Sequence, residues 1–299
     1  MGILYVSIIG AFVRWRWLSV ACLALCLLWS LLLVSCPESP VHLARRGNNE
    51  EAKSTLTFLR GNSDITRELT EIIQSTNGAV KKPWTALFTN PVHLRPLVIS
   101  LMLMLGRQLS GVNAVIFFSV NIFNAAKTTQ MNSFMENVVV SSAQVAATAI
   151  AVFLVDRLGR RILLVSSALI MMISLYSLGV YFWLLNDNIA KHNIEFLPLA
   201  SLCTFIVAFA IGFGPITWLM NSEIFSPDVK GIANSISATF NWTLAILVTE
   251  CFQTVTGIIG VAGTFWSFAC VLQIVMTYIV FFVPETKGKS LEEIQLGFK

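Results

Sequence analysis

Residues 107–113 read Arg-Gln-Leu-Ser-Gly-Val-Asn, which places a cation, two amides and a glycine inside an apolar segment long enough to cross a bilayer. A charge near the centre of a bilayer costs at least about 3 kcal/mol, so polar residues there face a bundle interior or a water-filled path. The stretch therefore predicts a membrane-spanning helix whose polar face has a function.

The composition of the whole chain is typical of a membrane protein. Hydrophobic residues make up 56% of the chain and charged residues only 12%, whereas about 25% of the residues in ordinary soluble domains are charged. The net charge of +4 gives no sign of a nucleic-acid partner. The six cysteines lack zinc-type or redox spacing and the three histidines lie outside the apolar segments, so we expect no metal and no cofactor.

Apolar stretches of about 17 to 25 residues are long enough to span a bilayer. They predict a short first piece at 3–13 and seven spans, at 17–36, 96–123, 134–155, 162–185, 197–221, 232–255 and 260–283. The polar stretch at 38–95 carries helix-start signals and predicts a small helical insert. We therefore expect an all-α membrane protein.

Most of the 20 lysines and arginines fall on one side of this topology. That side holds the insert, the loops at 156–161 and 222–231, and the C-terminal tail. Because cytoplasmic loops carry an excess of Lys and Arg, we expect the insert and the C-terminus in the cytoplasm, with the plasma membrane as the host membrane.

Six short motifs follow one another along the chain. They are Pro37-Glu-Ser-Pro40, Gln108-Leu-Ser-Gly-Val-Asn113-Ala-Val, Asp156-Arg-Leu-Gly-Arg-Arg161, Gly212-Phe-Gly-Pro-Ile-Thr-Trp218, Asn241-Trp242 and Pro284-Glu-Thr-Lys-Gly-Lys-Ser290. In this order they resemble the sugar porter family of the major facilitator superfamily, and the resemblance covers nearly the whole chain. It implies twelve spans in two six-helix halves, with a cytoplasmic helical insert between the halves.

The resemblance assigns each part of the chain to a part of that fold. Residues 1–37 correspond to the end of the fifth span and the sixth span, and 38–95 to the cytoplasmic helical insert. Residues 96–283 correspond to the six-span C-terminal half of a major facilitator fold, and 284–299 to the cytoplasmic tail. We therefore expect a complete protein to carry an N-terminal half upstream.

A sugar carrier needs side chains that both donate and accept hydrogen bonds, and flat aromatic faces for the C–H surface of a pyranose. The spans supply such a set in Gln108, Asn113, Gln144, Trp218, Asn241 and Trp242. By resemblance, Gln108, Asn113, Trp218 and Asn241 match sugar-contacting positions of facilitative glucose transporters, and Gln144 falls where those have asparagine. The alternative is that the amides only hold helices together, each contributing about 1 kcal/mol.

Some residues depart from the family pattern. Arg107 stands where the first glutamine of a Gln-Gln pair is usual, and its depth differs from that of Glu250, so we expect Arg107 to face the cavity and alter substrate choice. Ala210 replaces a frequent glutamate, and Thr217 replaces the second proline of Gly-Pro-Ile-Pro-Trp. These changes weaken a glucose assignment, and other details look more like the insect facilitated trehalose transporter branch.

Glycine and proline predict helix breaks at two places. Proline removes a backbone donor and glycine tolerates unusual dihedrals, and carriers place substrate beside discontinuous helices. The alternative is close helix packing at small residues. The residues concerned are Gly111, Gly212, Gly214 and Pro215.

Charged residues at the cytoplasmic helix ends resemble a gate in this family. Ion pairs between helix ends would hold that side closed and separate on release, giving the two-state element that alternating access requires. The arginines also serve as topology signals. The gate residues are Glu38, Asp156, Arg157, Arg160, Arg161, Glu223 and Glu285.

The sequence thus predicts part of a sugar porter that moves a neutral sugar, trehalose or a hexose, by alternating access and without enzymatic chemistry. Its partners would be the sugar, the bilayer, and a missing N-terminal half or a full-length homologue. The main alternative is a truncated half-carrier that does not transport and acts as a sensor or an inhibitory partner. A membrane enzyme is a third reading, but the loops carry no Ser/His/Asp, metal-ligand or nucleotide-binding set.

Overall fold

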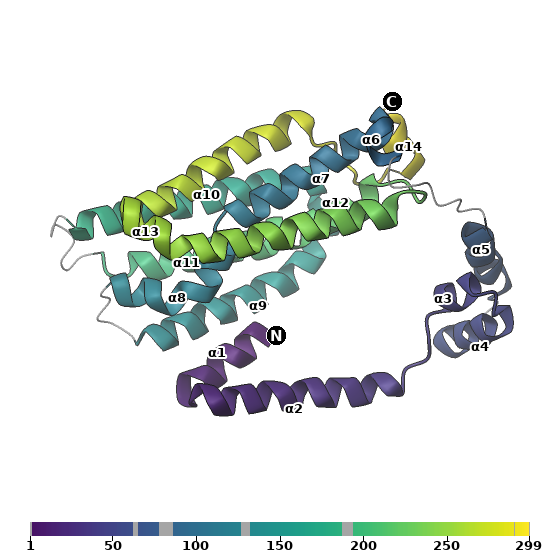
Figure 1. Ribbon diagram of the computed structural model, residues 1–299, viewed down its shortest axis with the longest axis horizontal. Helices are drawn as coiled ribbons and strands as arrows, with labels where there is room; N and C mark the ends of the chain where they lie inside the picture. The colour runs from purple at the N-terminus through teal and green to yellow at the C-terminus, as the bar shows by residue number, and fades with distance from the viewer. Residues whose placement is uncertain are drawn as a thin grey trace. The chain divides into compact units, whose positions relative to one another are not determined.

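The computed structural model describes residues 2–61, 65–77, 86–126, 132–186, 194–289 and 291–298. Within these ranges the regular elements are fourteen helices (Figure 1). The chain forms two compact units, one of residues 13–83 and a larger one of residues 1–12 and 84–299. Part of the predicted insert around Lys81 and the last residue of the sixth motif, Ser290, lie outside the described residues.

The smaller unit contains one long apolar helix and three short polar ones. Helix α2 (Trp15–Val34) has 20 residues, none of them buried, as expected for a helix whose whole surface meets lipid. Helices α3 (Pro40–Arg45), α4 (Asn49–Arg60) and α5 (Thr66–Asn77) pack around a small apolar core that includes Leu43, Ala52 and Ile72.

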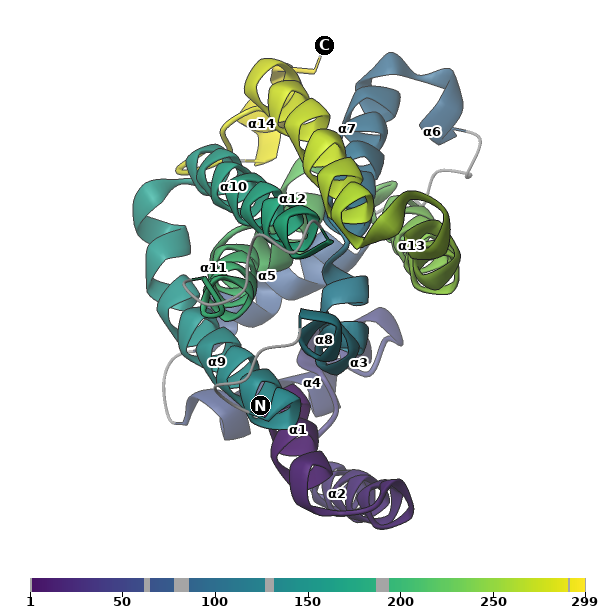
Figure 2. The ribbon, with the colours of Figure 1, turned by 90° about the vertical axis from the view of Figure 1, so that its left-hand side faces the viewer.

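The larger unit is a bundle of long apolar helices, seen from one end in Figure 2. Its elements are α1 (Gly2–Phe12), α6 (Ala86–Thr89), α7 (Pro91–Leu109), α8 (Val112–Ala126), α9 (Ser133–Leu158), α10 (Arg160–Asn186), α11 (Leu197–Ile211), α12 (Phe213–Ile224), α13 (Lys230–Phe282) and α14 (Leu291–Leu296). Helix α10 packs against α11 and α13, α7 against α13, and α9 against α11. Helix α1 packs on α9, where the hydroxyls of Ser7 and Ser141 are 2.9 Å apart.

Three of the long apolar segments contain a backbone break at a glycine. Helices α7 and α8 meet at Gly111, which has φ of +78°, and α11 and α12 meet at Gly212. Helix α13 turns at Gly260, with φ of 76° and ψ of 167°. Counting α7 with α8 and α11 with α12, six helical segments of the described chain are long and apolar enough to cross a membrane.

The predicted spans 232–255 and 260–283 lie in the single helix α13. Its 53 residues would extend about 80 Å if straight, whereas a bilayer core is about 30 Å thick. The helix therefore has room for two spans, and Gly260 turns the chain between them where the sequence suggested a short loop.

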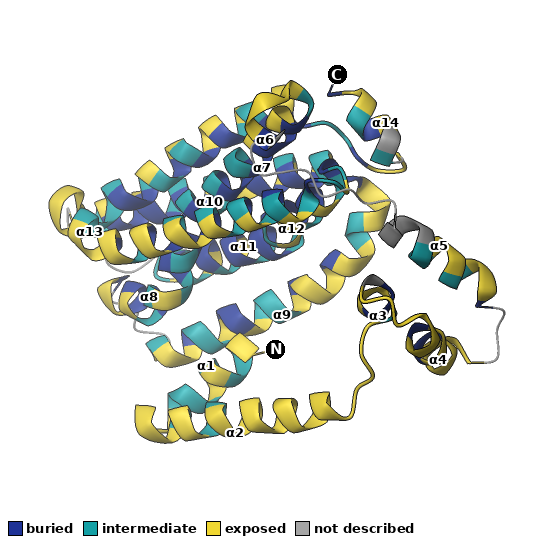
Figure 3. Ribbon diagram, turned by 45° about the vertical axis from the view of Figure 1, so that its right-hand side comes forward, coloured by how far each residue is buried: buried dark blue, intermediate teal, exposed yellow. Residues whose placement is uncertain are grey.

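Apolar side chains cover both the inside and the outside of the larger unit. Phe123, Phe205 and Phe265 are fully buried in its core, whereas Phe153 and Ile258 are 69% and 77% exposed. Figure 3 shows buried residues on the inner faces of the bundle helices and exposed residues on the outer faces. An exposed apolar surface of this kind is what lipid covers.

Candidate functional site

A series of hydrogen bonds inside the larger unit links α7, α8 and α13. Asn113 Nδ2 donates to Gln108 Oε1 at 2.8 Å, and Gln108 Nε2 donates to Asn241 Oδ1 at 2.8 Å. Arg107 Nη1 donates to the same Asn241 oxygen at 3.2 Å. Gln108 and Asn241 are 1% and 0% exposed, while Arg107 and Asn113 are partly exposed. We call these four residues the amide chain.

The break at Gly111 gives the amide chain its shape. Because the backbone leaves the helical conformation there, α8 starts in a new direction and Asn113 comes within hydrogen-bond distance of Gln108. The ring of Phe268 fills the space that a Cβ on residue 111 would occupy. A residue with a side chain would meet both a strained φ and this ring.

Arg107 connects the amide chain to two aromatic rings. Its guanidinium carbon lies 5.5 Å from the ring centroid of Phe209 and 5.6 Å from that of Trp218, within the range of cation–π attraction. Glu250, whose depth in its span was expected to differ from that of Arg107, is exposed on α13. The expected position of Arg107 facing the cavity stays a prediction.

Both rings line a cavity of about 680 Å³. Ligand pockets commonly have volumes of about 300 to 1,000 Å³, so the space suits a mono- or disaccharide. Trp218, which is 37% exposed, is one of its aromatic lining residues. The lining residues are Gln144, Thr148, Ala151, Val152, Val155, Asp156, Phe209, Ala210, Gly214, Pro215, Trp218 and Leu219.

The structure groups most of the predicted sugar-binding residues, but in two sets. Gln144 and Trp218 line the cavity, whereas Gln108 and Asn241 are closed off from it and bond to each other in this conformation. Trp242, the next residue along α13, is 62% exposed and belongs to neither set. Its predicted contact with sugar stays a prediction.

The break between α11 and α12 borders the same cavity. A Cβ on Gly212 would lie 2.7 Å from the carbonyl oxygen of Leu163, so α12 approaches α10 closely there. Pro215 lies in the first turn of α12, where a missing N–H leaves no helical hydrogen bond unmade. Thr217, which replaces a second proline, donates its hydroxyl to the Phe213 carbonyl at 2.9 Å.

Sequence reasoning missed a second buried polar group near the amide chain. Ser100 on α7 donates to Asn221 Oδ1 on α12 at 2.7 Å, and its oxygen is 2.7 Å from the hydroxyl of Ser237 on α13. Ser100 and Ser237 precede Gln108 and Asn241 by eight and four residues, a spacing that puts them on the same helix faces. That spacing was the available signal for Ser100 and Ser237. Sequence reasoning also missed Phe209, because it looked like an ordinary core residue.

A charged cluster lies where α10 begins and α12 ends. Arg160 Nη2 and Glu223 Oε1 form an ion pair at 2.9 Å, with both side chains mostly buried. Glu223 Oε2 also accepts the hydroxyl of Thr286 at 2.5 Å. Glu285 accepts the backbone N–H groups of Arg160 and Arg161 at 3.0 and 3.1 Å. The cluster therefore ties the segment after α13 to α10 and α12.

These N–H groups change the acidity of Glu285. Burial acts to raise the pKa of its carboxyl, but four backbone N–H groups, those of Lys287, Arg160, Arg161 and Thr286, act against it and the net pKa is lowered. A carboxylate that accepts several N–H groups is held in its charged form. Glu285 thus stays ionised at neutral pH.

The other predicted gate residues take less part in the cluster. Arg157 contributes its carbonyl oxygen, which accepts from Lys287 Nζ at 2.6 Å, and Arg161 Nη2 donates to the Val280 carbonyl. Asp156 is exposed and lines the cavity beside Trp218. Glu38 belongs to the smaller unit.

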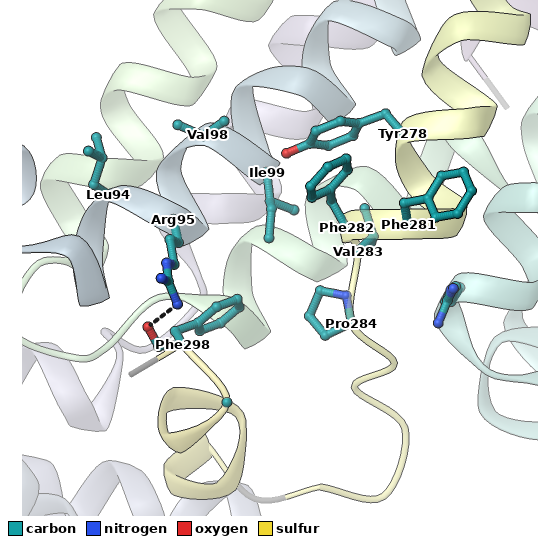
Figure 4. Close-up of a pocket in the computed structure, with 12 residues that line it drawn as sticks. Leu94, Arg95, Val98, Ile99, Tyr278, Phe281, Phe282, Val283, Pro284 and Phe298 are labelled. Atoms are coloured by element: carbon teal, nitrogen blue, oxygen red, sulfur yellow. Dashed lines mark hydrogen bonds between the residues drawn. The ribbon is translucent and has the colours of Figure 1, made fainter.

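A second cavity, of about 780 Å³, lies beside the segment that follows α13 (Figure 4). Tyr278, Phe281 and Phe282 of α13 line it together with Arg95 of α7, whose Nη1 donates to the Phe298 carbonyl at 3.2 Å. Helix α14 and Phe298 thereby pack on the ends of α7 and α12, where Gln295 Nε2 also donates to the Ile224 carbonyl at 2.8 Å.

The groups present suit reversible binding. Within the described residues, no group of three His, Cys, Asp or Glu side chains is placed to hold a metal ion. The cavity offers the ring of Trp218 and the amide of Gln144, with the cation of Arg107 near that ring, and such groups can bind a polyol through hydrogen bonds and stacking.

Comparison with known proteins finds a matching family and similar relatives. Residues 2–298 match the family described as "Sugar (and other) transporter". The facilitated trehalose transporter Tret1 of Aedes aegypti is 38% identical over 99% of this chain and 37% of its own length. Tret1 of Polypedilum vanderplanki is 39% identical over 99% of this chain and 59% of its own length. The chain thus spans well under two thirds of these relatives.

Solved structures of a xylose carrier have a similar fold. The major facilitator superfamily proton:xylose symporter XylE, bound to 6-bromo-6-deoxy-D-glucose, matches with a TM-score of 0.77 and 28% identity over 95% of this chain and 59% of that one. The inward-open xylose transporter XylE from E. coli gives a TM-score of 0.77 and 25% identity over 99% and 62%.

Proposed function

The chain belongs to the sugar transporter family, and on that premise we propose that it forms part of a carrier that binds a sugar in the Trp218 cavity and moves it across the membrane by alternating access. The observation that carries the proposal is the amide chain beside this cavity. Polar side chains inside apolar helices are costly, and here they lie next to a space of the size of a sugar.

The Trp218 ring would stack on the C–H face of the sugar, as aromatic faces do with apolar surfaces. Gln144, on the same cavity wall, supplies an amide that both donates and accepts. The buried amides Gln108 and Asn241 would position Arg107 and Asn113 in this conformation, and would meet the sugar after the helices rearrange at Gly111 and Gly212.

The charged cluster supports a gating role. Ion pairs that link helix ends have two discrete arrangements, joined and parted, and such two-state elements are what alternating access requires. We assign the cluster to the cytoplasmic side, because most lysines and arginines lie on that side of the spans. We propose the plasma membrane as the host membrane. Trehalose and hexoses are the first substrates to test, since the relatives named above are trehalose transporters.

Substitution of Trp218 tests the binding site. We expect Trp218→Ala to weaken sugar binding by about ten-fold or more, because the stacking face and the cation–π contact of Arg107 are both lost. Binding of trehalose and glucose to the purified chain in lipid nanodiscs, followed by calorimetry, measures this. Gln108→Ala should act in the same direction without lowering the yield in membranes.

Trp183→Ala is the matched control, since Trp183 is a half-exposed tryptophan on α10 outside the cavity. Trp218→Ala binding as tightly as the unchanged chain would remove the cavity from the proposal. The non-transporting alternative predicts a different result, namely inhibition of sugar uptake when the chain is added to vesicles that hold a full-length carrier.

A further inference from the structure

Arg107 carries an uncompensated charge in the binding region. Among the described residues no carboxylate forms an ion pair with its guanidinium. Asp156 lines the Trp218 cavity, and among the described residues it forms no ion pair with Arg107. A guanidinium stays protonated in proteins, so this span holds a permanent positive charge next to the cavity.

Arg107 also fixes the direction of every bond in the amide chain. A guanidinium has only donors, so the oxygen of Asn241 must face it, and Gln108 must then offer its NH₂ to that oxygen. The remaining oxygen of Gln108 accepts from Asn113. The side-chain oxygen of Gln108 and the side-chain oxygen of Asn241 therefore each accept a hydrogen bond.

The groups left without partners are donors. Arg107 Nε and Asn241 Nδ2 are buried and have no acceptor, and Asn241 is fully buried. Buried polar groups normally have partners, and an unpaired one costs free energy. The region thus has an excess of donors and of positive charge, which a ligand rich in acceptors would balance.

We propose that the site prefers a sugar that carries a carboxylate, a uronic or aldonic acid, over the corresponding neutral sugar. The inference rests on the proposed function, because it names the substrate class of that same cavity. Arg107 is partly exposed, and its guanidinium carbon lies 5.6 Å from the ring centroid of Trp218, which lines the cavity. A ligand carboxylate placed at the edge of this ring would be near the guanidinium. Arg–carboxylate pairs have two parallel N–H···O bonds, which gives them strength and direction.

The test compares glucuronate with glucose on the purified chain in phosphatidylcholine nanodiscs, at constant ionic strength, by calorimetry. We expect the Kd of glucuronate to be about ten-fold or more below that of glucose, as for a hydrogen bond to a charged group. Arg107→Gln should bring the ratio of the two constants to near one, and Arg107→Lys should restore part of it. Arg95→Gln, which removes the other arginine of α7, is the matched control and should keep the full ratio.

The possible outcomes separate this inference from the proposed function. Equal binding of glucose and glucuronate by the unchanged chain would overturn the inference and leave sugar binding intact. A ratio that survives Arg107→Gln would overturn it too, as would acetate binding as tightly as glucuronate, which marks a general anion site. Absence of binding by either sugar would end the proposed function, and the inference with it.

Discussion

Gly111 determines how one membrane span accommodates two helices. Its φ of +78° lies in the left-handed region, where a residue with a Cβ costs about 1 to 2 kcal/mol, and Phe268 occupies the Cβ position. Gly260 has nearly the same φ of +76°, but nothing lies within 4 Å of its Cβ position. A substitution at Gly260 therefore has a backbone effect alone, whereas one at Gly111 adds a packing effect.

We expect Gly260→Ala to lower the stability of the purified chain by about 1 to 3 kcal/mol, because its φ of 76° and ψ of 167° lie in a region that essentially only glycine adopts. Gly111→Ala should lower it by roughly 3 kcal/mol, because overpacking against Phe268 adds to the backbone strain. Thermal unfolding in detergent measures both. The double variant Gly111→Ala, Phe268→Ala should recover part of the loss relative to Phe268→Ala alone. No recovery in the double variant would show that Phe268 does not constrain residue 111.

Single residues show what the sequence could predict of the site and what it could not. Residue type and depth in a span marked Arg107, Gln108 and Trp218, because a polar group in lipid needs a reason. Residue type and depth could not predict that Gln108 would donate a hydrogen bond to Asn241, 133 positions away, and be buried outside the cavity. Such pairing depends on how α7 packs on α13, which periodicity does not contain.

At the scale of elements, the charged cluster joins α10, α12 and the segment after α13 through two carboxylates, Glu223 and Glu285. The pKa of Glu285 is lowered in the folded protein from its ordinary value of 4.5. A lowered folded pKa contributes stability that is present above the ordinary value and is lost as the pH falls through the folded value.

We expect Glu285→Gln to lower stability at pH 7 by roughly 2 kcal/mol, because the N–H groups of Arg160 and Arg161 lose a charged acceptor. The unchanged chain should lose stability as the pH drops below 4.5, and the variant should show a shallower loss over that window. Thermal unfolding between pH 7 and pH 3 measures this. Glu68→Gln is the control, since Glu68 pairs with Arg60 on the exposed surface of the smaller unit. An identical pH profile for Glu285→Gln and the unchanged chain would contradict the role given to Glu285.

The sequence predicted the helices more completely than the connections between them. Apolar length identified the long helices, and the all-α membrane fold of major facilitator type is confirmed. Helix α7 begins at Pro91, five residues before the predicted span, because proline suits a first helical turn. The connection inside α13 looked like a loop in sequence, since hydropathy shows where polar residues are and not how one glycine turns a backbone.

At the scale of the whole molecule, transport needs a surface for the bundle to move against. Family relatives span about twice the length of this chain or more in the cases compared, and carriers of this kind work by rocking one repeat against another. The cavity beside Trp218 belongs to the larger unit alone, so sugar binding and sugar movement should be separable.

We expect vesicles that hold this chain alone to bind labelled sugar and show no concentrative or exchange uptake, and co-expression with the N-terminal half of a homologous carrier to restore exchange. Uptake of labelled trehalose and glucose, with empty vesicles as the control, measures this. Rapid exchange by the chain alone would mean that two copies of it supply both sides of the pathway.

Asn241 lies in the part of α13 before Gly260, and the part after Gly260 leads into the segment that holds Glu285. A single residue, Gly260, joins these two parts of α13 without a loop between them. Asn241 of the amide chain and the carboxylate that accepts the backbone N–H groups of Arg160 and Arg161 therefore lie on one continuous stretch of backbone.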